Sequence, residues 1–117
     1  MNFLKNLLTR KIHILLEPHQ ITVKNLDTGA EITRQPLEPY SCGRLIISHF
    51  AVFEDFLKSV MLELNPKEGL LTPSYIMYVD IKHDFTTPIT VVESRSVIDA
   101  CEHAGAREVH LDWEEHL

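Results

Sequence analysis

Residues 75–79, with the sequence Tyr-Ile-Met-Tyr-Val, form a continuous apolar run. A run without polar alternation predicts a strand of a parallel sheet that is covered on both faces. Downstream, Thr90 and Glu93 have the spacing of a capping box and predict the start of a helix, which Gly105 is able to end in a left-handed conformation. A strand, a helix and a further strand in succession predict a parallel pair joined by a helical crossover.

The segments next to this unit extend the sheet and its helical cover. Apolar and polar residues alternate from Glu108 to Trp113, which predicts a last strand with one buried face and one polar face, at an edge of the sheet. Upstream, apolar residues recur at three- and four-residue steps from Phe50 to Leu64. This spacing predicts a helix with one buried face, which Asn65-Pro66 ends.

The first forty residues predict three further strands. Lys11 to Leu16 is a short apolar run, and Glu17-Pro18 ends it because proline has no amide donor. The turn Asp27-Thr28-Gly29 separates two short segments with alternating residues and predicts an antiparallel hairpin. Gln35 to Tyr40 contains two prolines, so it predicts an extended connector instead of a central strand.

The order of the predicted elements is βββαβαβ. Antiparallel hairpins at the start and helical crossovers later predict a mixed α/β sheet in which strands one, four and five are parallel. This order is typical of the ribonuclease-H-like half-fold. We therefore predict an amphipathic N-terminal segment at residues 1–10 and one domain at residues 11–117.

The composition fits one globular domain, with 117 residues of which 44% are hydrophobic and 24% are charged. The formal net charge of -6 argues against a nucleic-acid partner, because phosphate binding requires a dense basic surface. Cys42 and Cys101 have neither a metal-binding spacing nor the pattern of a disulfide framework. Since no stretch reads as a signal peptide or a membrane span, we expect a cytoplasmic protein.

Two stretches resemble the MreB/Mbl family of bacterial actin-like rod-shape-determining proteins. Residues 88–98, Pro-Ile-Thr-Val-Val-Glu-Ser-Arg-Ser-Val-Ile, look like the family's threonine and V-E-R-like helix start, and residues 104–109, Ala-Gly-Ala-Arg-Glu-Val, look like its G-A-R-E-V motif. Residues 43–48 and the helix at 50–64 are similar to the family's loop and first helix. The resemblance extends over residues 11–115 and implies the first half of one actin-like ATPase lobe.

The residues that would bind nucleotide depart from this family. Its members hold ATP between two hairpins, where glycines, aspartates and threonines let backbone amides approach the phosphates. Here the first hairpin, Leu15 to Gln20, has no glycine, aspartate or hydroxyl, and Pro18 lacks an amide donor. The second hairpin and the adenosine pocket belong to the family's other lobe, beyond Leu117, and the interdomain helix would follow Glu114-Glu115. Residues 35–43 are too few for most of the small outer subdomain. We therefore expect no ATPase activity, no cofactor and no metal ion.

Glu93 has two interpretations. By the resemblance it matches the glutamate that orients the attacking water on the terminal phosphate of the nucleotide. By its spacing from Thr90 it caps the N-terminus of a helix and complements the helix dipole without any catalysis. Capping is the preferred interpretation, and we predict no catalytic residue.

The N-terminal segment also has two interpretations. Phe3, Leu4, Leu7 and Leu8 would cluster on one side of a short helix, with cationic residues nearby. The resemblance implies that such a segment contacts the inner membrane peripherally, by apolar insertion and attraction to anionic lipids. The alternative is a terminal helix packed on its own domain or on a partner protein.

Metal and nucleophile chemistry is weakly supported. The seven histidines have no helical pair spacing typical of metal ligands. Asp80, His83 and Asp84 could form an acidic corner at the end of the central strand, but the first strand supplies no aspartate for a nuclease-type metal site. Cys101 falls on the apolar face of its helix and is expected to pack in the core.

Three functions remain open from the sequence. The first is a truncated MreB-like protein without ATPase activity that serves as an interaction module of the bacterial cytoskeleton. The second is a residual nucleotide-dependent enzyme completed by a partner chain, and the third is a small homo-oligomeric adaptor unrelated to cell shape. For a partner protein or for self-association, the predicted contact is the edge of the last strand, at His110, Asp112 and Trp113.

Overall fold

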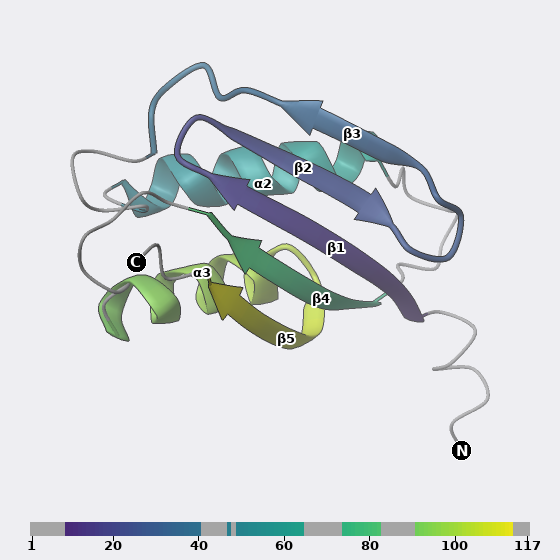
Figure 1. Ribbon diagram of the computed structural model, residues 1–117. Helices are drawn as coiled ribbons and strands as arrows, with labels where there is room; N and C mark the ends of the chain where they lie inside the picture. Colours follow the sequence, from purple (N-terminus) through teal and green to yellow (C-terminus); the bar gives the residue numbers. More distant parts are fainter. Residues whose placement is uncertain (1–8, 41–46, 48, 65–73, 83–90, 114–117) are drawn as a thin grey trace.

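The computed structural model describes residues 9–40, 47, 49–64, 74–82 and 91–113, which form a five-stranded sheet and two helices (Figure 1). The predicted order βββαβαβ is confirmed. β1 begins two residues before the predicted start of the domain, so Thr9 and Arg10, which the sequence places in the predicted N-terminal segment, lie in the sheet. The strands are β1 (Thr9–Glu17), β2 (Gln20–Asn25), β3 (Glu31–Arg34), β4 (Ser74–Ile81) and β5 (Ala106–Trp113), and the helices are α2 (Phe50–Leu64) and α3 (Val91–His103).

The sheet has the strand order β3-β2-β1-β4-β5. β2 is antiparallel to both β1 and β3, whereas β4 is parallel to both β1 and β5. The predicted mixed sheet, with three parallel strands and antiparallel hairpins, is therefore confirmed. The predicted edge position of the last strand is confirmed as well, because β5 ends the strand order.

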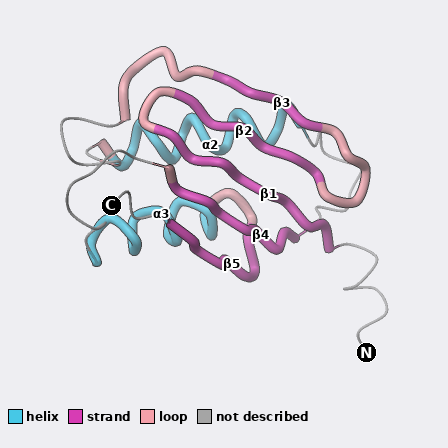
Figure 2. Tube along the Cα trace, viewed as in Figure 1, coloured by secondary structure: helices cyan, strands magenta, loops and turns pink. Residues whose placement is uncertain are grey.

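Both helices lie against the same face of the sheet (Figures 1 and 2). α2 contacts β2, β3 and α3, and α3 contacts β5. Alternate strand residues and one face of each helix meet in a single core, and each large aliphatic side chain buried there contributes about 1.5–3 kcal/mol. Fully buried core residues include Ile12, Ile14, Leu16, Ile21, Val23, Phe53, Leu57, Met77 and Ile81.

β4 is covered on one face, and the expectation of cover on both faces is wrong for the described residues. Its residues alternate along the strand between half-buried and buried, beginning with half-buried Ser74 and ending with buried Ile81. Ile76 and Tyr78 occupy half-buried positions although they are apolar and aromatic. The alternation in burial along β4 is therefore not visible in the sequence as an alternation of apolar and polar residues. The face opposite the helices therefore carries side chains from all three parallel strands.

Two glycines adopt the left-handed conformations that their positions require. Gly29 ends the β2–β3 turn with a φ of 82°, and the Asn25 side chain accepts hydrogen bonds there from the amides of Asp27 and Thr28 at 2.9 and 3.1 Å. Gly105 follows α3 with a φ of 111°, as the sequence predicts. A Cβ at this position would lie 3.2 Å from the ring of Tyr75, so glycine also permits the close approach of α3's end to β4.

The connector after β3 supplies a core residue that the sequence pattern does not predict. Tyr40 is fully buried, and its ring packs edge-on against Phe53 and stacks on Phe56, with centroids 5.3 and 6.0 Å away. Its hydroxyl donates to the backbone carbonyls of Glu17 and Gln20, on either side of the β1–β2 turn. Burial, and secondly the Glu17 carboxylate, raise the pKa of this phenol, so it stays a donor at physiological pH. Tyr40 thereby ties the turn to α2.

Candidate interaction surface

The face of the sheet opposite α2 and α3, hereafter the open face, gathers titratable and aromatic side chains into rows. His13 of β1 pairs in register with Tyr78 of β4, which pairs with His110 of β5. Asp80 and Asp112 are paired on the next row, one step toward the carboxyl ends of these strands. On the three parallel strands the open face includes Lys11, His13, Leu15, Ile76, Tyr78, Asp80, Glu108, His110 and Asp112.

Side-chain contacts connect these rows across the strands. Nε2 of His13 lies 2.6 Å from Oδ2 of Asp80, a hydrogen bond that becomes an ion pair when the imidazole is protonated. The rings of Tyr78 and His110 are stacked, with centroids 5.1 Å apart and planes 13° apart. Nε2 of His110 also lies 3.3 Å from the Glu108 carboxylate. The sequence interpretation missed His13, Tyr78 and Asp80 as a group.

These groups are held in place but remain accessible. The exposed fraction of the side chain is 34% for His13, 45% for Asp80, 53% for His110 and 55% for Glu108. Exposed pairs of this kind contribute only about 0–1 kcal/mol to stability, because water screens them and ordering the side chains costs entropy. Their arrangement therefore suits contact with another molecule better than it explains the stability of the fold.

Charge is unevenly distributed over the open face. The carboxylates Asp80, Glu108 and Asp112 lie on β4 and β5. Lys11 and Glu17 lie on β1, Lys24 lies on β2 opposite His13, and the Arg107 guanidinium of β5 donates to Oγ1 of Thr9 at 3.4 Å. The β4–β5 half of the open face therefore has more carboxylates than cations, with Arg107 at its amino-terminal end, whereas the β1–β2 side carries both lysines.

β5 carries the residues that the sequence assigns to an edge contact. Among the described strands, β5 has no neighbour on its outer side. His110 and Asp112 are exposed, and Val109 and Leu111 pack partly against the core, as the alternation predicts. Trp113 is the last residue of β5, and its side chain lies outside the described part. That this edge binds a partner or a second copy stays a prediction.

Glu93 is the third residue of α3 and is buried, with 4% of its surface exposed. It shares the core-facing side of the helix with Val97, Ala100 and Cys101. The third helical position is where a capping-box carboxylate stands, next to the positive end of the helix dipole. The position is therefore that of a cap, while its expected partner Thr90 lies outside the described residues.

The β1–β2 turn occupies the place of the first nucleotide hairpin in the resemblance. Only Pro18 and His19 separate the paired residues Glu17 and Gln20. The turn contains no glycine, Pro18 provides no amide donor, and the Tyr40 hydroxyl occupies the flanking carbonyls. Such a short turn has few backbone amides for a phosphate.

The core position predicted for Cys101 is confirmed, because 1% of the residue is exposed. Burial, with a smaller effect of the Glu102 charge, raises the pKa of its thiol to about 12, which leaves almost no thiolate at neutral pH. No three histidine, cysteine or carboxylate side chains among the described residues are grouped to hold a metal ion. His83 and Asp84 of the considered acidic corner lie outside the described ranges.

The apolar N-terminal residues Phe3, Leu4, Leu7 and Leu8 also lie outside the described residues, so both interpretations of that segment stay predictions. In the part of the chain that the structure describes, neither helix has the length and apolar character required to cross a bilayer.

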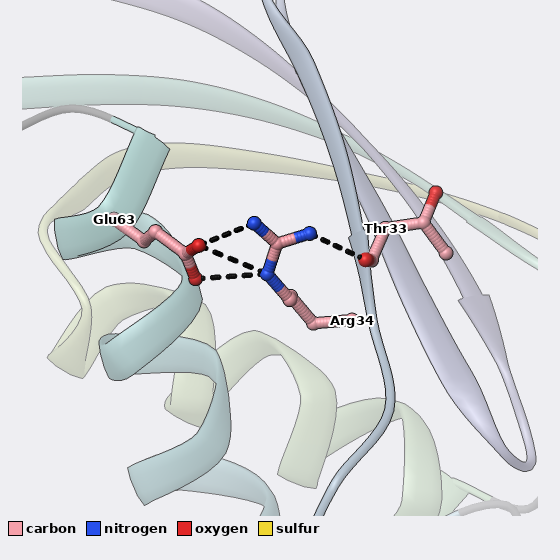
Figure 3. Close-up of polar contacts among 3 residues, drawn as sticks. All are labelled: Thr33, Arg34 and Glu63. Carbon is pink, nitrogen blue, oxygen red and sulfur yellow. Dashed lines mark hydrogen bonds and ion pairs between the residues drawn. The ribbon is translucent and has the colours of Figure 1, made fainter.

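A second surface feature lies between the connector after β3 and α2. It is a groove of about 430 Å³ whose apolar lining includes Pro36, Val52 and Phe56. At one end the Arg34 guanidinium forms paired hydrogen bonds with the Glu63 carboxylate, at 2.9 and 3.0 Å from Nε, and donates to the Thr33 carbonyl at 2.8 Å (Figure 3). The hydrogen bond from Arg34 lowers the pKa of Glu63 and keeps the pair ionised. This pair fastens β3 to α2.

Comparison with known proteins identifies the architecture. No family model and no curated protein matches the chain. Among solved structures, MreB5 of Spiroplasma citri bound to ADP matches 90% of this chain with a TM-score of 0.60 at 11% sequence identity. The AMPPNP-bound form of the same protein gives the same TM-score at 12% identity. The chain has an actin-like fold.

The covered share of MreB5 and the low sequence identity limit the conclusion from this comparison to the fold. The actin-like match covers 38% of the MreB5 chain, so this chain spans well under half of that protein. At 11–12% identity the likeness shows the fold alone. The PPX-GPPA enzyme of Aquifex aeolicus matches with a TM-score of 0.42, which is too low to carry an argument.

Proposed function

We propose that this chain is a non-catalytic, MreB-like interaction module that binds proteins of the bacterial cell-shape cytoskeleton through the open face and the β5 edge. The observation that carries the proposal is the open face. Parallel strands are normally covered on both faces. Here the described helices cover one face, and half-exposed side chains occupy the other.

The β1–β2 turn and Glu93, which by the resemblance would lie near a bound nucleotide, support a non-catalytic role. The β1–β2 turn has two residues between its paired ends and no glycine, and the buried Glu93 stands where a helix cap is needed. Titration of the protein with Mg·ATP by calorimetry tests this point. The proposal predicts no heat of binding, and a dissociation constant at or below the micromolar range would favour the alternative of an enzyme completed by a partner chain.

The cellular part of the proposal rests on the resemblance and on the actin-like fold. According to the proposal, the protein is cytoplasmic and residues 1–8 bring it to the inner membrane. Affinity purification from the cell that makes this chain is the test. Recovery of actin-like filament proteins would support the proposal, and their absence from the purified material would contradict it.

Among the described strands β5 has no outer neighbour, which favours a second candidate, the homo-oligomeric adaptor. A strand edge with free backbone groups is a template for pairing with another strand, although Glu108 and Asp112 are charges of the kind that protect such edges. Light scattering distinguishes the two candidates. A concentration-dependent dimer without filament partners would favour the adaptor, and a strict monomer would exclude it.

A further inference from the structure

We infer that the acidic half of the open face is a docking site for a basic amphipathic helix of a partner protein. The site consists of Ile76, Tyr78 and Asp80 of β4 with Glu108, His110 and Asp112 of β5. This inference rests on the proposed function as an interaction module, and it names the chemistry of the partner.

The shape of the site favours a helix as its occupant. Helices are the elements that normally cover parallel strands, because their apolar stripe matches a sheet face. Eight residues of β4 extend over about 26 Å, which about 18 residues of helix would span. Ile76 and Tyr78 form the apolar centre of the site, and a strand-like partner would instead use the edge of β5.

The charges of the site specify the partner's chemistry. Asp80, Glu108 and Asp112 surround the apolar centre, so lysines or arginines beside the partner's apolar stripe would meet carboxylates. A second copy that offered the same half face would bring carboxylates against carboxylates. Charge therefore disfavours self-docking at this site.

The stacked pair of Tyr78 and His110 adds a second recognition element. The two rings are stacked face to face on neighbouring strands, with their centroids 5.1 Å apart and their planes within 13° of parallel. Because β5 is the outermost of the described strands, a guanidinium group of a partner is able to stack on the face of the His110 ring that points away from Tyr78, while it pairs with a neighbouring carboxylate such as Asp112. The site accordingly fits arginine better than lysine.

A designed peptide is the probe for this site. It has about 18 residues, a leucine stripe at helical spacing and flanking arginines, and it carries a fluorophore for anisotropy measurements. The full chain should bind it saturably, with an affinity that falls as salt rises. A matched peptide with glutamates in place of the arginines should not bind, and binding of both peptides alike would overturn the inference.

Matched variants locate the contact. Asp80→Asn with Asp112→Asn should weaken peptide binding about tenfold or more. The control pair Asp55→Asn and Glu102→Gln makes the same change in net charge on exposed positions of α2 and α3 and should leave the affinity unchanged. Circular dichroism and thermal midpoints verify that both variants stay folded. Equal affinities for the two variants, or no binding by the unmodified chain, would contradict the docking site.

The same variants separate this inference from the proposed function. If peptide binding depends on Asp80 and Asp112 but purification recovers no actin-like filament proteins, the docking site stands and the cytoskeletal function is wrong. If filament proteins are recovered but the peptide does not bind, the function stands and the docking site is wrong. A dimer that dissociates in the Asp80→Asn, Asp112→Asn variant would make a second copy the occupant and would also overturn the inference.

Discussion

Leu15 and Leu16 are neighbours in β1, yet they belong to two different surfaces of the same sheet. Leu16 is fully buried against the helices, whereas Leu15 is half-buried on the open face beside Asp80. The helix-covered face consists of aliphatic residues in close contact. On the open face, titratable side chains contact one another across strands. The difference indicates that one face carries the stability of the fold and the other is available for recognition.

The largest expected effect is the difference in the free energy of unfolding between alanine variants of these two leucines. Leu16→Ala should destabilise the fold by about 2–5 kcal/mol, because it leaves a cavity in the core. Leu15→Ala should cost less than about 1 kcal/mol, because solvent already reaches the side chain. Urea unfolding followed by circular dichroism measures both values. Similar losses for the two variants would mean that the open face is covered in solution.

The two tyrosines provide the next comparison. Tyr40→Phe removes the hydroxyl that donates to the Glu17 and Gln20 carbonyls but keeps the ring contacts, and it should cost about 1–2 kcal/mol. Tyr78→Phe on the open face should change the free energy of unfolding by less than about 0.5 kcal/mol. Thermal melts of the two variants test this. An unchanged midpoint for Tyr40→Phe would show that the β1–β2 turn does not depend on the phenol.

Variants of Glu93 test whether this residue stabilises the start of α3. If it caps the helix, Glu93→Ala should cost about 1 kcal/mol, Thr90→Ala should cost a similar amount, and the two effects should not add. Chemical denaturation of the single and double variants gives the coupling. Additive losses would show that the two residues act independently. Unchanged midpoints in all three variants would contradict the capping role.

Cys101 provides the smallest effect and a pH test of the core. In a Cys42→Ser background, its thiol should resist alkylation at pH 8 in the folded state and react in denaturant. Because the folded pKa of about 12 lies above the unfolded value, its contribution to stability is complete at neutral pH and is lost as pH rises between these two values. Mass spectrometry of the alkylated protein gives the result. Rapid labelling of the folded chain would indicate an open core.

Most of the fold is predictable because its signals are local. The helical spacing from Phe50 to Leu64, the alternation in β5 and Gly105 after α3 each involve residues close in sequence. The surface is different, since the contact between His13 and Asp80 joins positions 67 residues apart. It depends on the register between β1 and β4, which no local pattern specifies. Tyr40 was missed for the same reason, because its partners belong to other elements.

In the proposed function, the open face contacts an actin-like filament protein. Photo-crosslinking in the native cell tests it most directly, with p-benzoylphenylalanine in place of Tyr78 on the open face or in place of Glu102 on α3. The proposed function predicts a crosslink from position 78 to an actin-like filament protein and none to that protein from position 102. A crosslink to that protein from position 102 alone, or none from position 78, would contradict it.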